Sequence, residues 1–223
     1  MKILSAAFVS RPFSKESKRE AIRELLENTV PDRDFYILVL GAIILASCGI
    51  LTDSIPVLIA SMIVAPLAYP ILGLGLGLLA GNIKIIGRSI SMLVISIILT
   101  IIIAGLFSLF IKSYFTVAER VFISFFPNIF FDLLIAVISG AIAAYGLVRT
   151  KVGGAMTGIG IAVSLMPPLV ATGIGLFDPA HDLAIRAATI FVLNVIGILA
   201  GSIFAFGILG VGREYQAVRE HLK

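Results

Sequence analysis

Charged residues are scarce in this chain: Asp, Glu, Lys and Arg make up 13% of its 223 residues, against about 25% in a typical soluble domain. Hydrophobic residues make up 59%, and the mean hydropathy is +1.12. So few polar side chains are typical of a chain that folds in lipid rather than in water. The composition therefore predicts an integral membrane protein, with the lipid bilayer as its partner.

The basic residues give a net charge of +4, but they are scattered one or two at a time between long apolar runs. A nucleic-acid-binding face concentrates Lys and Arg on one surface. We therefore expect no nucleic-acid partner and interpret these residues as determinants of membrane topology.

Residues that carry catalytic or metal chemistry are almost missing. The chain has one cysteine, Cys48, and two histidines, His181 and His221, which both lie outside the apolar runs. A single cysteine can form neither an intramolecular disulfide nor a cysteine-based metal cluster, so we interpret Cys48 as a small buried apolar residue. No HExxH or GxSxG pattern occurs. We expect no enzyme activity, no metal site and no cofactor.

Long apolar runs are what the chain has in abundance. A helix needs about 20 apolar residues to cross the hydrocarbon of a bilayer, and six runs approach that length: 35–51, 55–80, 90–111, 133–148, 152–176 and 187–210. They predict an all-α, polytopic membrane helix bundle. Since no signal-peptide pattern precedes the first run, we expect it to be an uncleaved span.

The basic residues predict how these spans are oriented. With six spans and the N-terminus inside, only Lys112, Arg120 and Arg186 of the 17 Lys and Arg fall outside. By the positive-inside rule, both termini are cytoplasmic. The chain then divides into a cytoplasmic segment, a three-span unit, an aromatic-rich outer loop, a second three-span unit and a cytoplasmic tail: 1–34, 35–111, 112–131, 132–210 and 211–223.

The first of these segments contains a short amphipathic helix over 13–30. Ser17 and Glu20 have the spacing of a capping box, and Pro31 ends the helix. We favour a helix that lies on the cytoplasmic leaflet over one that binds a partner.

The two three-span units resemble one another. A shift of 100 residues aligns GLGL at 73–76 with GIGL at 173–176. The middle span of each unit also carries two prolines near its centre, Pro66 with Pro70 and Pro167 with Pro168. Because three spans are an odd number, homologous units would be inverted relative to each other. We therefore predict two inverted three-helix repeats with broken second and fifth spans.

Each break would release polar backbone groups inside the membrane. Proline has no N–H to donate, so the carbonyls of Met62, Pro66, Val163 and Ser164 would lose their helical donors. Irregular backbone at this depth survives only where protein or a water-filled cavity satisfies it. Half-helix N-termini would favour an anion or polar solute, and freed carbonyls a cation. A kink packed by neighbouring helices, without a ligand, is the alternative.

These considerations predict a substrate pathway between the broken spans. Asn194 is the strongest polar candidate, because an amide in hydrocarbon must find partners across helices. The expected lining is Ser61, Met62, Pro66, Pro70, Gly73, Val163, Ser164, Pro167, Pro168, Thr172 and Asn194. A weaker set of polar residues lies at the span ends: Asp53, Asn82, Asn128 and Asp132. A carboxylate at a span end, such as Asp53 or Asp132, is usually a helix cap or a solvated charge. No ionisable residue falls in the middle of a span, which argues against a proton relay.

Several stretches carry a resemblance to a known family, among them IASMIVAPLAYPILGLGLGLLAGN (59–82), FPNIFFDLLIAVISGAIAAYG (126–146) and GIGIAVSLMPPLVATGIGL (158–176). From residue 32 onward the chain resembles the prokaryotic family of uncharacterised hydrophobic proteins called domain of unknown function 389. The resemblance implies a multi-pass protein of the prokaryotic plasma membrane. Members typically have an acidic residue where this chain has Asn82, and many have a longer soluble domain before the first span. The family pattern falls on Asp53, Ser54, Met62, Pro66, Pro70, Gly73, Arg88, Pro127, Asn128, Asp132, Tyr145, Pro167, Pro168 and Asn194.

The leading hypothesis is a transporter or channel-like protein for a small ion or polar solute, with its site between the second and fifth spans. A membrane scaffold or sensor without transport activity is the alternative. Glycine spacings at 73, 77 and 81 and at 154 and 158 would also support helix packing in a homo-oligomer.

Overall fold

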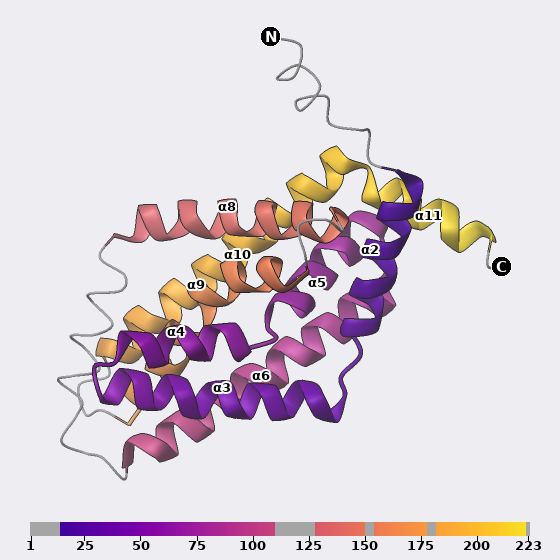
Figure 1. The fold of residues 1–223 in the computed structure, drawn as a ribbon. Helices are drawn as coiled ribbons and strands as arrows, with labels where there is room; N and C mark the ends of the chain where they lie inside the picture. The colour runs from indigo at the N-terminus through magenta and orange to yellow at the C-terminus, as the bar shows by residue number, and fades with distance from the viewer. Residues whose placement is uncertain (1–13, 110–127, 150–153, 178–181, 222–223) are drawn as a thin grey trace.

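The structure is a computed structural model that describes residues 14–109, 128–149, 154–177 and 182–221, with side chains throughout except at 154–164 and 218–221. All the regular elements in these ranges are α-helices (Figure 1). They are α2 Lys15–Asn28, α3 Arg33–Leu51, α4 Ile55–Val64, α5 Ala68–Ala80, α6 Ile83–Leu109, α8 Ile129–Val148, α9 Gly154–Gly175, α10 Asp182–Leu209 and α11 Val211–His221.

Four helices, α3, α6, α8 and α10, are long and apolar enough to cross a membrane, and α4 with α5 forms a fifth span if the bent pair is counted as one. Large apolar side chains cover their outer faces; Phe204 and Ile208 on α10 are 68% and 70% exposed. Such contiguous apolar surface requires lipid around it. The chain is therefore compatible with a multi-pass membrane protein. The count of six spans and the inverted repeat remain predictions.

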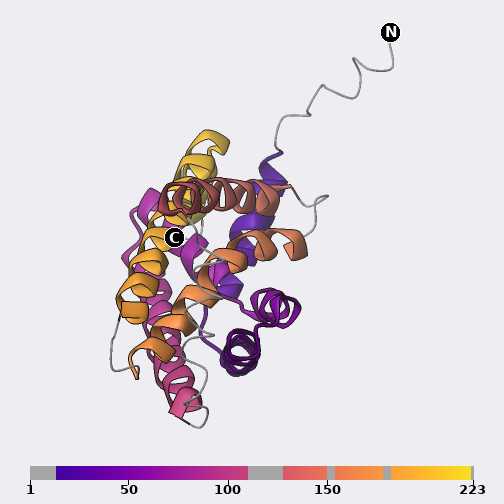
Figure 2. The ribbon, with the colours of Figure 1, turned by 90° about the vertical axis from the view of Figure 1, so that its left-hand side faces the viewer.

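Helix α9 occupies the centre of the bundle. All residues from Leu165 to Gly175 are buried, and α9 packs against α3, α4, α6, α8 and α10. A helix that is apolar on all sides has no face to show to water, which explains this central position. In Figure 2, where α3 and α4 are seen end-on, α9 lies between this pair and α10.

Helices α8 and α10 form the closest packed pair. Gly140 on α8 faces the backbone of Ile198, and Gly201 on α10 faces the carbonyl oxygen of Val137. At both positions an added Cβ would collide with backbone atoms of the opposite helix. Small residues let membrane helices approach in this way and gain dispersion contacts.

Helices α2 and α11 lie together at one end of the bundle (Figure 1). Arg19 Nε on α2 donates to Glu214 Oε1 on α11 at 2.7 Å. Gly210 has a φ of 67° and separates α11 from α10; this left-handed conformation is available to glycine at little cost. The segments that precede the first span and follow the last one therefore meet on the same side.

The amphipathic helix differs from its prediction in two respects. It starts one turn before the predicted capping box, because Ser14 is the N-cap and its side chain accepts from Ser17 N at 3.0 Å. Its apolar stripe, with Ala21, Ile22 and Leu25, is buried. Helix α2 packs against α5, α8 and α11, so this stripe faces protein rather than the leaflet.

Candidate functional site

The break in the second span lies where the first proline pair predicted it. Helix α4 ends at Val64, Ala65 is extended with φ −66° and ψ 119°, and α5 starts at Ala68. The two helix axes differ by 46°. Pro66 lies in the break, and Pro70 is in the first turn of α5, where a missing N–H costs no helical hydrogen bond.

The predicted break in the fifth span is wrong. Helix α9 includes Pro167 and Pro168 in one continuous helix. Both prolines are enclosed by neighbouring helices, and membrane helices tolerate proline where such neighbours support the backbone. The two prolines still leave the carbonyls of Val163 and Ser164 without their intrahelical donors. The side chains of these two residues lie outside the described part of the chain.

The predicted pathway residues on α4 and α9 lie in the interior, since these two helices pack together. Ser61, Met62 and Thr172 are all buried. The Ser61 hydroxyl donates to Leu58 O at 2.6 Å, and the Thr172 hydroxyl donates to Pro168 O at 2.7 Å. Both hydroxyls thus bond back to their own helix, as often happens in apolar surroundings.

Gly73 and Asn194 lie in different parts of the bundle. Gly73 on α5 is in a packed contact with Thr29, the C-cap residue of α2, and with the Ser89 hydroxyl of α6, with no room for a Cβ. Asn194 is buried on α10 with 1% of its surface exposed. The predicted set therefore does not converge on one point; it is spread over α4, α5, α9 and α10.

Three of the four span-end residues have structural roles. Asp53 is exposed in the turn after α3 with a φ of 54°, and Asn128 caps α8 by accepting from Phe130 N at 3.0 Å. Asn82 Oδ1 accepts from Lys84 N at 2.9 Å, and its Nδ2 donates to the Tyr215 hydroxyl of α11 at 2.5 Å. Asn128 and Asn82 thus accept from backbone N–H groups at the starts of α8 and α6.

Asp132 is the exception and is not a solvated charge. It lies in the first turn of α8 and is 8% exposed. Its Oδ2 has no hydrogen-bond partner in the described part of the chain. The predicted span began at 133, whereas α8 begins at Ile129, so four more residues, Asp132 among them, belong to the helix.

Sequence reasoning missed a line of buried hydroxyl groups on α6. Ser89, Ser96, Thr100 and Ser108 are each at most 1% exposed. The Ser89 and Ser96 hydroxyls have no hydrogen-bond partner among the described residues. Intervals of 7, 4 and 8 residues keep all four on one face of a helix. This helical spacing of polar residues in an apolar run was the signal that would have found them.

The α6 hydroxyls lie level with the prolines of α9. Gly173 faces Ile101 and Ala104 of α6, and both helices run toward the end of the bundle where α10 begins (Figure 1). Ser96 is five residues before Ile101, and Pro168 is five residues before Gly173. The same distance along each helix places Ser96 at the level of the proline pair.

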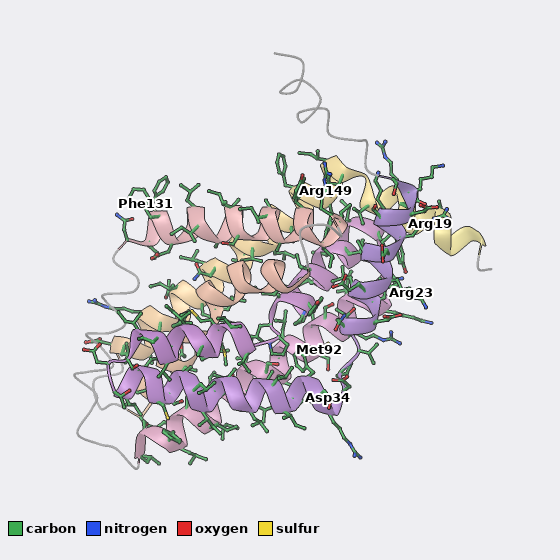
Figure 3. The ribbon with its side chains drawn as sticks, viewed as in Figure 1. Arg19, Arg23, Asp34, Met92, Phe131 and Arg149 are labelled. Carbon is green, nitrogen blue, oxygen red and sulfur yellow. The ribbon has the colours of Figure 1, made fainter. Side chains whose placement is uncertain are left out.

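Helix α2 contacts the second span close to its break. The Tyr69 hydroxyl in the first turn of α5 donates to Glu24 Oε1 of α2 at 3.1 Å. Figure 3 shows Arg19 and Arg23 of α2 at this end of the bundle. Helix α2 thus contacts the half-helix directly after the break.

One cavity lined by described residues lies elsewhere, in an open groove between α8 and α10. Its volume is about 280 Å³, and its walls include Ala141 and Tyr145 of α8 and Phe204 and Ala205 of α10. Its walls are almost entirely apolar. Such a surface offers a polar solute no hydrogen-bond partners, so this cavity is not the predicted site.

Comparison with known proteins assigns the family. The family described as "Domain of unknown function (DUF389)" matches residues 62–200, more than half of the chain. The chain belongs to this family. It is 28% identical over 205 residues to an uncharacterized protein of Methanocaldococcus jannaschii, covering 88% of this chain and 62% of that protein. The chain thus spans less than two thirds of that relative's length. No solved structure matches the chain.

Proposed function

We propose that this DUF389 protein is a six-span membrane transporter or channel-like protein for a small ion or polar solute. The observation that carries the proposal is the buried hydroxyl face of α6 beside the broken α4–α5 span. From Ser89 to Ser108 this face extends for about 28 Å at 1.5 Å per residue, close to the roughly 30 Å of hydrocarbon in a bilayer. Polar groups along the whole thickness of the membrane are what a solute path requires.

The path is closed in this conformation, because all four hydroxyl-bearing residues are buried. Opening it requires one wall to move. The α4–α5 span is suited to this, since the non-helical residues 65–67 already interrupt its hydrogen-bond ladder. Hinges of this kind are a few residues at element ends that absorb changes in backbone angles.

The family and the charge distribution support the proposed location, a prokaryotic plasma membrane with both termini inside. Basic residues concentrate in segments 1–34 and 211–223, as the positive-inside rule requires of cytoplasmic segments. Arg19 of the first segment and Glu214 of the second form an ion pair, so the two segments lie at the same end of the bundle. We further propose that the protein is not an enzyme, binds no nucleic acid and works without a cofactor.

Reconstitution of the purified protein into liposomes tests the proposal. We expect uptake of at least one member of a panel of Na⁺, K⁺, chloride, phosphate and neutral amino acids. Protein-free liposomes made from the same lipids are the control, and uptake is measured with radiolabelled solutes. Uptake equal to that of protein-free liposomes for every solute would contradict transport.

A membrane scaffold or sensor is the second candidate, and the contacts of α2 and α11 with α5 favour it. The bonds Tyr69–Glu24 and Asn82–Tyr215 join the two terminal helices to the ends of the same half-helix. A partner that displaced α2 would therefore act directly on the broken span. A protein of this kind would show no uptake in the liposome experiment.

A further inference from the structure

Asp132 is a charged residue type in an unusual position. It is 8% exposed, and Oδ2 has no hydrogen-bond partner in the described part of the chain. A buried carboxylate without a partner is costly, because it loses hydration without receiving a compensating charge. Such a group is neutralised either by a proton or by a cation bound next to it.

Asn194 lies in the neighbouring turn of α10. Ala136 of α8 and Gly197 of α10 face each other, and Val137 and Gly201 do so further along the two helices, which therefore run in the same direction. Asp132 is four residues before Ala136, and Asn194 is three before Gly197. One helical turn back from the same contact thus places the carboxylate and the buried amide at the same level of the two adjacent helices.

The proline pair of α9 brings two more oxygen atoms to this level. Gly175 of α9 faces Ala184 of α10, and Figure 1 shows these helices running in opposite directions. Asn194 is ten residues after Ala184 on α10. On α9, the carbonyls of Val163 and Ser164 lie eleven to twelve residues before Gly175, so they are at nearly the same distance from the α9–α10 contact as Asn194. Because Pro167 and Pro168 have no N–H, both carbonyls lack their intrahelical donors.

Among the described residues, no charged side chain that would neutralise Asp132 faces it from the helices packed against α8. On α10, Asp182 and Arg186 are exposed, and the sequence of α9 contains no ionisable residue. Helix α2 contacts α8, but Figure 3 shows that Phe131, next to Asp132, and Arg149 mark opposite ends of α8, with α2 at the Arg149 end. Within the described part of the chain no side chain neutralises Asp132, which leaves a cation or a proton from solution to do so.

We propose that Asp132, Asn194 and the carbonyls of Val163 and Ser164 form a binding site for a monovalent alkali cation. All the donors are oxygen atoms, which hard cations prefer, and they supply one negative charge for one positive charge. As a coupling-ion site it rests on the proposed transport function; as a binding site it does not.

Thermal unfolding of the purified full chain in detergent tests the site with Na⁺ as the probe. At pH 8 and constant ionic strength, replacing choline chloride with NaCl should raise the Tm of the wild type by about 3 °C or more. The isosteric Asp132→Asn variant should show no Na⁺ response, because its amide carries no charge to neutralise. Asp53→Asn, which changes an exposed aspartate, is the matched control and should respond like the wild type.

Absence of a Na⁺ response in the wild type would overturn the site whether or not the variant folds. A Tm that is the same in Na⁺ and choline would overturn the site, as would a Na⁺ response retained in Asp132→Asn. A Tm that rises on acidification but not with Na⁺ would assign the site to a proton instead. Na⁺ binding without solute uptake would leave the site standing and remove only the transport function, whereas uptake without a Na⁺ response would remove only the site.

Discussion

Replacing Gly201 with leucine is expected to separate α8 from α10 and to prevent stable assembly of the bundle. A Cβ at this position would collide with the carbonyl oxygen of Val137 and lie 3.0 Å from Ala141 N. Both are backbone atoms of a helix that cannot move aside locally. Overpacking of this kind costs about 3 kcal/mol or more when the backbone itself must shift. The free energy of unfolding in mixed detergent micelles measures the loss.

Gly207→Leu is the matched control for this substitution. Gly207 lies on the same helix, and an added Cβ there would meet no atom within 4 Å. We expect its stability to stay within about 0.5 kcal/mol of the wild type, as for most surface substitutions. Equal stabilities of the two leucine variants would show that α8 and α10 do not pack through Gly201.

Ser96→Leu is expected to reduce solute uptake at least tenfold while leaving the protein folded. Ser96 lies in the middle of the α6 hydroxyl face, level with the prolines of α9, and its hydroxyl has no hydrogen-bond partner in the described part of the chain. Leucine would fill this part of the path with a larger apolar side chain. A polar solute would then lose a hydrogen-bonding position in the membrane interior, where water cannot replace it. Uptake into proteoliposomes under the conditions that give wild-type flux measures the effect.

Ile102→Leu provides the comparison on the same helix, because Ile102 is 50% exposed on the lipid-facing side of α6. Its uptake should equal that of the wild type. Both variants should elute as monodisperse protein on size-exclusion chromatography. Undiminished uptake by folded Ser96→Leu would rule out the α6 face as the path, even if the protein transports solutes.

Helix positions were largely predictable from apolar run length, because each span must supply enough residues to cross the bilayer. The second span shows this best: the run 55–80 corresponds to α4 and α5 with their break at Ala65–Leu67. Pro66 made that break predictable, since proline acts locally on its own helix. The ends of other spans depend on packing, and α6 begins seven residues before the predicted start at 90.

The course of α9 depends on the rest of the fold. The pair Pro167–Pro168 carries the same local signal as Pro66, yet α9 continues through it. The difference lies in the surroundings, because Leu165–Gly175 is buried on all sides, whereas Pro66 is only partly buried. Neighbouring helices can support a helix that has lost hydrogen bonds. Which helices become neighbours depends on the tertiary fold and cannot be predicted from the local sequence.

Two parts of the candidate site escaped sequence reasoning for different reasons. The spacing of the α6 hydroxyls predicts one polar face of a helix. A single serine or threonine in a membrane helix is common and predicts no functional role by itself. The predicted span begins at 133, one residue after Asp132. This boundary predicts a solvated Asp132, whereas the observed helix start at Ile129 buries it. The ends of a span depend on helix capping and tertiary packing, and the length of an apolar run gives no information about either.

Cysteine labelling along α6 tests the central claim, that its hydroxyl face lines a path open to water during function. Ser96→Cys and Ile102→Cys are prepared in a Cys48→Ala background, which removes the only native cysteine. Reaction with a charged, membrane-impermeant thiol reagent is then followed in proteoliposomes. The account predicts that Ser96→Cys is labelled and Ile102→Cys, which faces lipid, is not. Labelling at residue 102 without labelling at 96, or at neither position, would contradict it.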